Sequence, residues 1–139
     1  MSAKDRFHEI FKRALQKEGW QITHDPLWIQ VDGIIDMYID LGAEKIIAAE
    51  REGQKIAVEI KSFLSPSTLS EFHTALGQYI NYRYALSKRQ SERVLYLAVP
   101  QNIYNIFFQR SFIQSVIQDN QVKLLIFDVE KEEIIRCQN

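Results

Sequence analysis

Apolar residues recur along the chain with two different periods, and each period predicts one kind of element. Between residues 4 and 18 they fall at i, i+3, i+4 and i+7, the spacing of an amphipathic helix, and Gly19 ends this pattern. A longer helical pattern follows Thr68 and Glu71, which have the spacing of a capping box. A third helical stretch runs through residues 103–117. The sequence therefore predicts three helical stretches.

Alternating or unbroken apolar runs predict the strands between these helices. In residues 35–40 apolar and polar side chains alternate. This pattern places Asp36 and Asp40 on the solvent-exposed face of a strand, as surface acids. The runs 93–100 and 122–129 are apolar almost throughout, as in strands that are buried on both faces. The predicted strands are 20–23, 27–31, 35–40, 46–49, 56–60, 93–100, 122–129 and a short edge strand at 134–135.

The stretch from residue 44 to residue 62 combines strand patterns with the charged residues most suited to chemistry. Its two apolar runs flank a turn that contains Gly53, and tight hairpins need glycine for positive φ. Period-2 geometry then projects Glu59 and Lys61 from one face of the second strand. A Glu-x-Lys triplet is common by chance, so it has two interpretations. It is either a cross-strand ion pair or a divalent-cation site whose lysine orients a water or neutralises a phosphate.

The register of this predicted hairpin decides whether Glu44 lies beside Glu59. A two-residue turn at Glu52-Gly53 places Glu44 opposite Lys61, so that Glu44, Glu59 and Lys61 project together. A three-residue turn would shift the pairing by one residue and turn Glu44 to the far side of the sheet.

Composition, charge and cysteine content narrow the class of protein. The chain has 139 residues, of which 46% are hydrophobic and 25% charged, as in a single compact domain spanning 1–139. Its formal net charge of −1 is not the basic footprint of a free-standing DNA-binding protein. The lone Cys137 excludes an internal disulfide and a zinc site built from cysteines. Since no membrane span or secretory signal is visible, we expect a cytoplasmic protein.

The order of the predicted elements indicates an α/β sandwich with a mixed sheet. An acidic residue, then Glu59-Ile60-Lys61 on the next strand, then Gln78 and Tyr82 on the next helix, resembles the PD-(D/E)xK nuclease superfamily. This resemblance implies a restriction-endonuclease-like fold, a sandwich with a central mixed β-sheet flanked by helices. Over essentially its whole length, including residues 55–63 and 75–83, the chain is also similar to the XisH family, the fdxN element excision controlling factors.

The superfamily resemblance implies a metal site at the end of the Glu-x-Lys strand. Glu59 corresponds to a metal ligand, and Lys61 to the lysine that positions the attacking water or stabilises the transition state. We take Glu44 as the preceding acid and second metal ligand, although the superfamily prefers Asp there. The implied cofactor is Mg²⁺ or Mn²⁺.

Three further residues have counterparts in this superfamily. Glu9 corresponds to the acid that some members carry on the first helix, and Gln78 and Tyr82 correspond to residues that line the site. For Gln78 the alternative is an amide on the helix surface, and for Tyr82 it is simple core packing.

The family resemblance implies a role in programmed excision of a DNA element. Two functions fit the residues: a metal-dependent endonuclease that acts on DNA during excision, or a catalytically inactive accessory protein that binds DNA or a recombination partner. The partners implied are DNA, a XisI-like companion factor and the site-specific recombinase machinery, with a second copy of the chain as a further partner.

Overall fold

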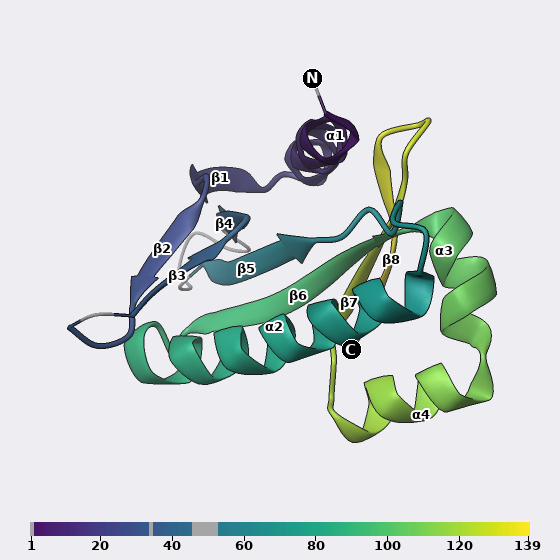
Figure 1. Ribbon diagram of the computed structural model, residues 1–139. Helices are drawn as coiled ribbons and strands as arrows, with labels where there is room; N and C mark the ends of the chain where they lie inside the picture. The colour runs from purple at the N-terminus through teal and green to yellow at the C-terminus, as the bar shows by residue number, and fades with distance from the viewer. Residues whose placement is uncertain (1, 34, 46–52) are drawn as a thin grey trace.

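The computed structural model describes residues 2–33, 35–45 and 53–139, which fold into an α/β sandwich (Figure 1). The helices are α1 (Ala3–Lys17), α2 (Thr68–Arg89), α3 (Gln101–Ile106) and α4 (Ser111–Asp119), with a 3-10 turn, η1 (Phe107–Gln109), before α4. The strands are β1 (Gln21–His24), β2 (Leu27–Gln30), β3 (Asp36–Ile39), β4 (Leu41–Lys45), β5 (Gln54–Ile60), β6 (Arg93–Pro100), β7 (Leu124–Asp128) and β8 (Glu133–Gln138).

Six of the strands in the described part of the chain form one mixed sheet in the order β1-β4-β5-β6-β7-β8. β5, β6 and β7 run parallel to one another, and the other neighbours are antiparallel. Parallel strands need long crossovers, which α2 provides between β5 and β6, and α3 and α4 provide between β6 and β7. β2 and β3 pair separately. The carboxyl end of β5 therefore lies inside the sheet, between β4 and β6.

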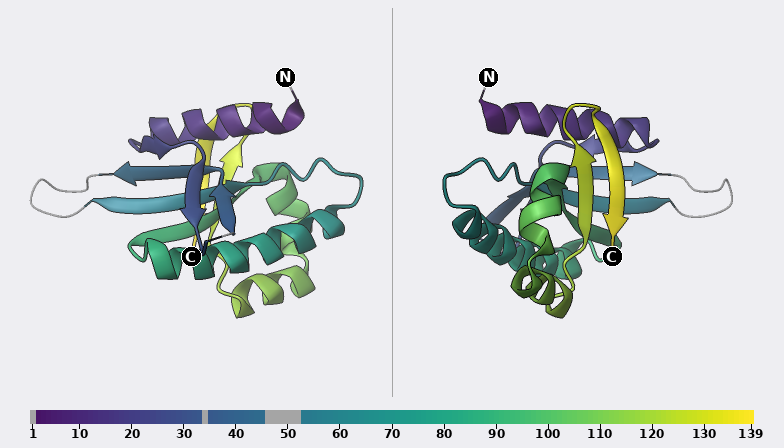
Figure 2. Two further views of the ribbon diagram at one scale, coloured as in Figure 1. Left: turned by 60° about the vertical axis from the view of Figure 1, so that its left-hand side comes forward. Right: turned by 90° about the vertical axis from the view of Figure 1, so that its right-hand side faces the viewer.

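Helices cover both faces of the sheet (Figure 2). On one face α1 packs Phe11 and Leu15 against Val58 and Phe127. On the other face α2, α3, η1 and α4 build a larger core, to which the β2–β3 pair also contributes. The buried aromatic residues of that second core are Phe63, Phe72, Tyr79, Tyr104 and Phe108.

Alternation along β5 determines which layer each of its side chains enters. Val58 and Ile60 belong to the α1 core, whereas Ala57 belongs to the α2 core. Successive side chains of a strand point to opposite faces, so Glu59 lies on the α2 side.

Local sequence explains where α1 begins and ends. Ser2 caps the helix by accepting a hydrogen bond from the N–H of Asp5 at 3.1 Å. Gly19 follows the helix with φ at +90°, a conformation that glycine adopts without steric cost.

The cap of α2 differs by one residue from the predicted capping box. Ser67, not Thr68, is the cap, and its hydroxyl accepts from the N–H of Ser70 at 3.1 Å. Glu71 does not complete the box, because its carboxylate accepts N–H groups from the preceding loop, including that of Phe63.

The structure confirms the predicted fold class, a central mixed sheet flanked by helices. The edge strand predicted at 134–135 is present and longer, as β8. The strand predicted at 46–49 lies outside the described residues, and the antiparallel partner of β5 is the earlier segment β4. Within the described residues, no helix combines the length and apolarity needed to cross a membrane.

Candidate functional site

Two carboxylates and a lysine converge at the carboxyl end of β5. Glu59 is only 6% exposed, and its Oε2 lies 3.4 Å from Lys61 Nζ. Its Oε1 accepts the backbone N–H of Asp40 at 3.4 Å, and Asp40 Oδ2 accepts the backbone N–H of Ile60 at 2.7 Å. The acid beside Glu59 and Lys61 is therefore Asp40, which the sequence pattern had placed on the surface.

The register of β4 against β5 explains why Asp40 occupies this place. Leu41 pairs with Val58, so Asp40, one residue before β4, stands level with Glu59 at the same end of the sheet. The chain bends at Asp40, between the small β2–β3 sheet and the main sheet. The Asp40 carboxylate accepts the N–H of Ile60, which lies beyond the last residue pair of β4 and β5.

Both predicted hairpin registers are wrong. Lys45 pairs with Gln54, so eight residues separate the paired ends of β4 and β5 where the prediction had a tight turn. Glu52, the first central residue of that predicted turn, lies outside the described residues.

Glu44 takes part in a different interaction from the one predicted. It pairs with Lys55, four residues before Glu59, which is about 13 Å along the strand at about 3.3 Å per residue. Its Oε1 lies 3.8 Å from Lys55 Nζ and 3.7 Å from the guanidinium of Arg93, a side chain buried against the sheet. Glu44 is thus a counter-charge for Arg93, and the structure does not bring it to Lys61.

The environment of Glu59 favours its neutral form. Burial is the main reason that its pKa rises from 4.5 to about 7, and the nearby charge of Asp40 adds to the rise, while Lys61 opposes it. A divalent cation between the two carboxylates would remove their repulsion and favour the ionised form. The donor set, two carboxylates with a lysine alongside, therefore fits a hard divalent cation.

Tyr82 faces the acidic residues from α2. Burial, with smaller contributions from the charges of Glu59 and Asp40, raises the pKa of Tyr82 to about 12, which places its hydroxyl in their field. Gln78 lies one helical turn earlier on the same face. Its Oε1 is buried and has no hydrogen-bond partner among the described residues. An unpaired buried acceptor is costly, so this oxygen suits a water or ligand in the site.

A carboxylate at the start of α2 fixes the chain that follows Lys61. Phe63 has φ at +56°, which is rare for a residue with a side chain. Its N–H donates to Glu71 Oε2, and the N–H of Ser65 donates to Glu71 Oε1 at 3.3 Å. The backbone N–H of Lys61 itself donates to the carbonyl of Ala98 on β6 at 3.0 Å. Hydrogen bonds at Lys61 and just after it therefore fix the backbone that carries the Lys61 side chain.

Glu9 belongs to a different polar group, on the opposite layer from Gln78. Carboxylate oxygens of Glu9 and Asp25 and a ring nitrogen of His8 lie within 4.8 Å of one another. Lys12 Nζ donates to Asp25 at 2.8 Å, and His8 Nε2 lies 2.7 Å from the same carboxylate. These ion pairs tie α1 to the segment between β1 and β2.

One signal in the sequence could have identified Asp40. It directly precedes Leu41-Gly42-Ala43, which are apolar or small on both faces, as expected of a central strand. All three are buried in the structure. An acid at the start of such a strand lies at the end of the sheet where an antiparallel neighbour finishes.

Comparison with known proteins supplies the family. The family model described as XisH protein matches residues 1–135. No curated protein matches the sequence.

Two solved structures resemble the chain closely. An XisH family protein from Nostoc punctiforme is 57% identical with a TM-score of 0.88, over 97% of this chain and 100% of that one. A protein from Anabaena variabilis, described as a fdxN element excision controlling factor, is 55% identical with a TM-score of 0.87, over 97% and 99% of the two chains. The chain therefore belongs to the XisH family.

Proposed function

We propose that the chain controls excision of a DNA element through a divalent-metal-dependent site that hydrolyses phosphodiesters. The observation that carries the proposal is the convergence of Asp40, Glu59 and Lys61 at the end of β5, with a buried Glu59 whose pKa is raised to about 7. The excision role is proposed from the description of the Anabaena variabilis protein.

The identity of the first acid supports the nuclease assignment. With Glu44 in this place, the site would depart from the Asp that the PD-(D/E)xK superfamily prefers. Asp40 removes that departure, because the acid just before the neighbouring strand, Glu59 and Lys61 then follow the superfamily's order of residue types.

Each residue has a distinct task in the proposed chemistry. Asp40 and Glu59 provide oxygen ligands for Mg²⁺ or Mn²⁺. When bound, the cation supplies Lewis-acid activation of a phosphate oxygen and of water. Lys61 positions the attacking water or neutralises charge that develops on the phosphate. The buried Gln78 Oε1 accepts a hydrogen bond from water in the site.

The low net charge points to a partner. At −1, the chain lacks the cationic surface that holds the DNA backbone firmly, so a companion such as a XisI-like factor, with the recombinase machinery, supplies phosphate contacts. The same charge favours the second candidate function, an accessory protein that binds its partner without cutting DNA.

A cleavage assay separates the two functions. Supercoiled and branched DNA are incubated with Mg²⁺ or Mn²⁺, with and without the companion factor. We expect metal-dependent cleavage that falls at least 100-fold in Asp40→Asn, Glu59→Gln and Lys61→Met, as for removal of one group that stabilises a transition state. Glu44→Gln is the matched control and keeps its activity. Uncut DNA under all conditions would contradict the nuclease and leave the accessory role.

A further inference from the structure

The layer of helices α2, α3 and α4, with the loop before α2, carries most of the large apolar side chains that are exposed. Six of the ten among the described residues lie there: Leu64, Leu69, Ile80, Tyr84, Ile106 and Phe112. Figure 1 shows α4 at the outer edge of this layer. Exposed apolar side chains that gather on one side of a molecule are typical of a contact surface.

Charged residues are scarce in the same part of the chain. Residues 94–122 contain two of them, Arg110 and Asp119, although 25% of the whole chain is charged. Arg110 directly precedes α4, and Asp119 is its last residue. Both are exposed, and neither has an opposite charge within 4.0 Å among the described residues. A surface depleted of charge but rich in apolar side chains resembles the core of a protein–protein interface.

These two charges oppose the dipole of α4. A helix has partial positive charge at its amino end, beside Arg110, and partial negative charge at its carboxyl end, where Asp119 lies. Each placement costs stability within a single chain. An antiparallel neighbouring helix would reverse the cost, because its carboxyl end would meet Arg110 and its amino end would meet Asp119.

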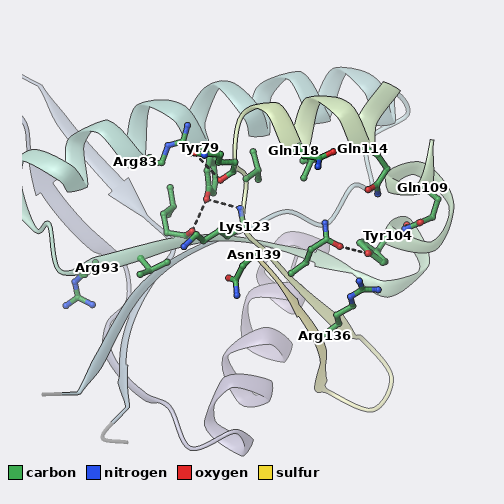
Figure 3. Close-up of a pocket in the computed structure, with 16 residues that line it drawn as sticks. Tyr79, Arg83, Arg93, Tyr104, Gln109, Gln114, Gln118, Lys123, Arg136 and Asn139 are labelled. Atoms are coloured by element: carbon green, nitrogen blue, oxygen red, sulfur yellow. Dashed lines mark hydrogen bonds between the residues drawn. The ribbon is translucent and has the colours of Figure 1, made fainter. Parts of the chain in front are cut away.

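One side of α4 faces outward and can accept such a neighbour. Gln114 and Gln118 line a cavity between α2, α4 and the sheet (Figure 3). Phe112, Ser115 and Asp119 are exposed instead, with the i, i+3, i+7 spacing of a single helical stripe. Phe112 is 69% exposed. The small side chain of Ser115, at the middle of the stripe, allows a second helix to approach closely.

We propose that a second copy of the chain packs against this stripe, with the two α4 helices antiparallel and crossing at Ser115. Arg110 lies five residues before Ser115 and Asp119 four residues after it, about 7.5 Å and about 6 Å along the axis at about 1.5 Å per residue. A twofold axis at Ser115 therefore brings Arg110 of each copy to Asp119 of the other and closes two ion pairs. Phe112 of each copy covers α4 of the other.

This surface is separate from Asp40 and Glu59, so the dimer stands independently of the proposed nuclease activity. Sedimentation velocity of the intact chain at micromolar concentrations tests it, and the unaltered chain should form dimers. Arg110→Glu and Asp119→Arg should each weaken dimerisation at least tenfold, because each places two pairs of like charges at the contact. Phe112→Ser should weaken it by removing an apolar contact.

Mixing the two charge variants tests the contact directly. In a mixed dimer each substituted side chain meets an opposite charge, so an equimolar mixture of Arg110→Glu and Asp119→Arg should dimerise as tightly as the unaltered chain. Circular dichroism checks that each variant is folded.

The matched control is Lys4→Glu, which makes the same change of charge at the start of α1, on the opposite face of the sheet. It should dimerise as the unaltered chain does. The proposal is overturned if the unaltered chain stays monomeric at high micromolar concentration, or if either charge variant dimerises normally. A mixture that is no tighter than its components, or an equal loss in Lys4→Glu, would also overturn it.

Discussion

Asp40 and Glu59 are joined through the main chain of one and the side chain of the other: the N–H of Asp40 donates to Glu59 Oε1 at 3.4 Å. The Asp40 carboxylate meanwhile accepts the N–H of Ile60. Backbone groups therefore hold both carboxylates in place without a cation, and the proposed metal site is assembled in advance.

Manganese should stabilise the folded chain through these two carboxylates. At a concentration 100 times the dissociation constant, ligand linkage adds about 2.7 kcal/mol to the free energy of unfolding. Thermal melts should show this as a rise in melting temperature that is lost in Asp40→Asn and Glu59→Ala. Glu44→Gln should keep the full rise, and a response that depended on Glu44 instead would place the cation elsewhere.

Without metal, the stability of the chain should fall as pH rises from about 4.5 to 7. The pKa of Glu59 is raised to about 7, so in this range the folded state holds a proton that the unfolded state releases. At 1.36 kcal/mol per pKa unit, the total loss is about 3 kcal/mol. Urea denaturation in EDTA at pH 5 and pH 8 measures it. Glu59→Gln should remove most of this pH dependence, and an unchanged slope in the variant would contradict the shift.

Replacing Gln78 should improve stability while it harms function. Its buried Oε1 has no partner among the described residues, so Gln78→Met should raise the free energy of unfolding by about 1 kcal/mol. The same variant should reduce metal-dependent DNA cleavage. Gln16→Met, on the exposed side of α1, is the control and should change neither quantity. A loss of stability in Gln78→Met would indicate ordinary packing by the amide.

Arg93 should matter more for stability than its partner Glu44. Its guanidinium donates to the carbonyl of Ile56 at 2.9 Å and to Gln90 at 2.6 Å, so Arg93→Met leaves buried acceptors unpaired and should cost about 3 kcal/mol. Glu44 is more exposed, and Glu44→Gln should cost about 1 kcal/mol or less. Chemical denaturation compares the two. Equal losses would mean that the ion pair, not the hydrogen bonds, dominates.

The chain should form a complex with a XisI-like companion factor. Co-expression followed by size-exclusion chromatography at micromolar concentration should give one peak that contains both proteins. The complex should bind DNA more tightly than the chain alone, and its affinity should fall steeply with salt, because the companion supplies phosphate contacts. Separate elution of the two proteins would count against this partner.

The sequence predicted the parts of the candidate site's geometry that depend on one strand or one helix. Period-2 alternation predicted that Glu59 and Lys61 project together, and their side chains do meet at 3.4 Å. Helical spacing predicted a shared face for Gln78 and Tyr82, and on this face the charges of Glu59 and Asp40 contribute to the raised pKa of Tyr82. Local periods determine such relationships without knowledge of the tertiary fold.

The missing acid depended on pairing between strands, which the sequence predicted wrongly. The glycine at position 53 favoured a tight turn, and that turn would have brought Glu44 level with Lys61. The observed register instead places Leu41 against Val58 and so brings Asp40 to Glu59. Asp40 looked like a solvent-facing residue because the alternation of β3 was extended one residue too far, past the bend where the chain changes sheets.

The orientation of α2 about its own axis limits which sequence changes this helix can tolerate over evolution. Tyr82 faces Glu59 and Asp40, whereas the neighbouring Tyr79 donates to the carbonyl of Leu95 and Arg83 donates to the carbonyls of Asn120 and Gln121. Each residue advances the helix by about 100°, so an insertion before Gln78 would turn Tyr82 to the place of Arg83, and a deletion would turn Arg83 to the place of Tyr82. Either change would break the contacts on both faces at once. Substitutions on the exposed face carry no such penalty. We therefore expect natural variants of this helix to differ in residue type but to keep its length constant.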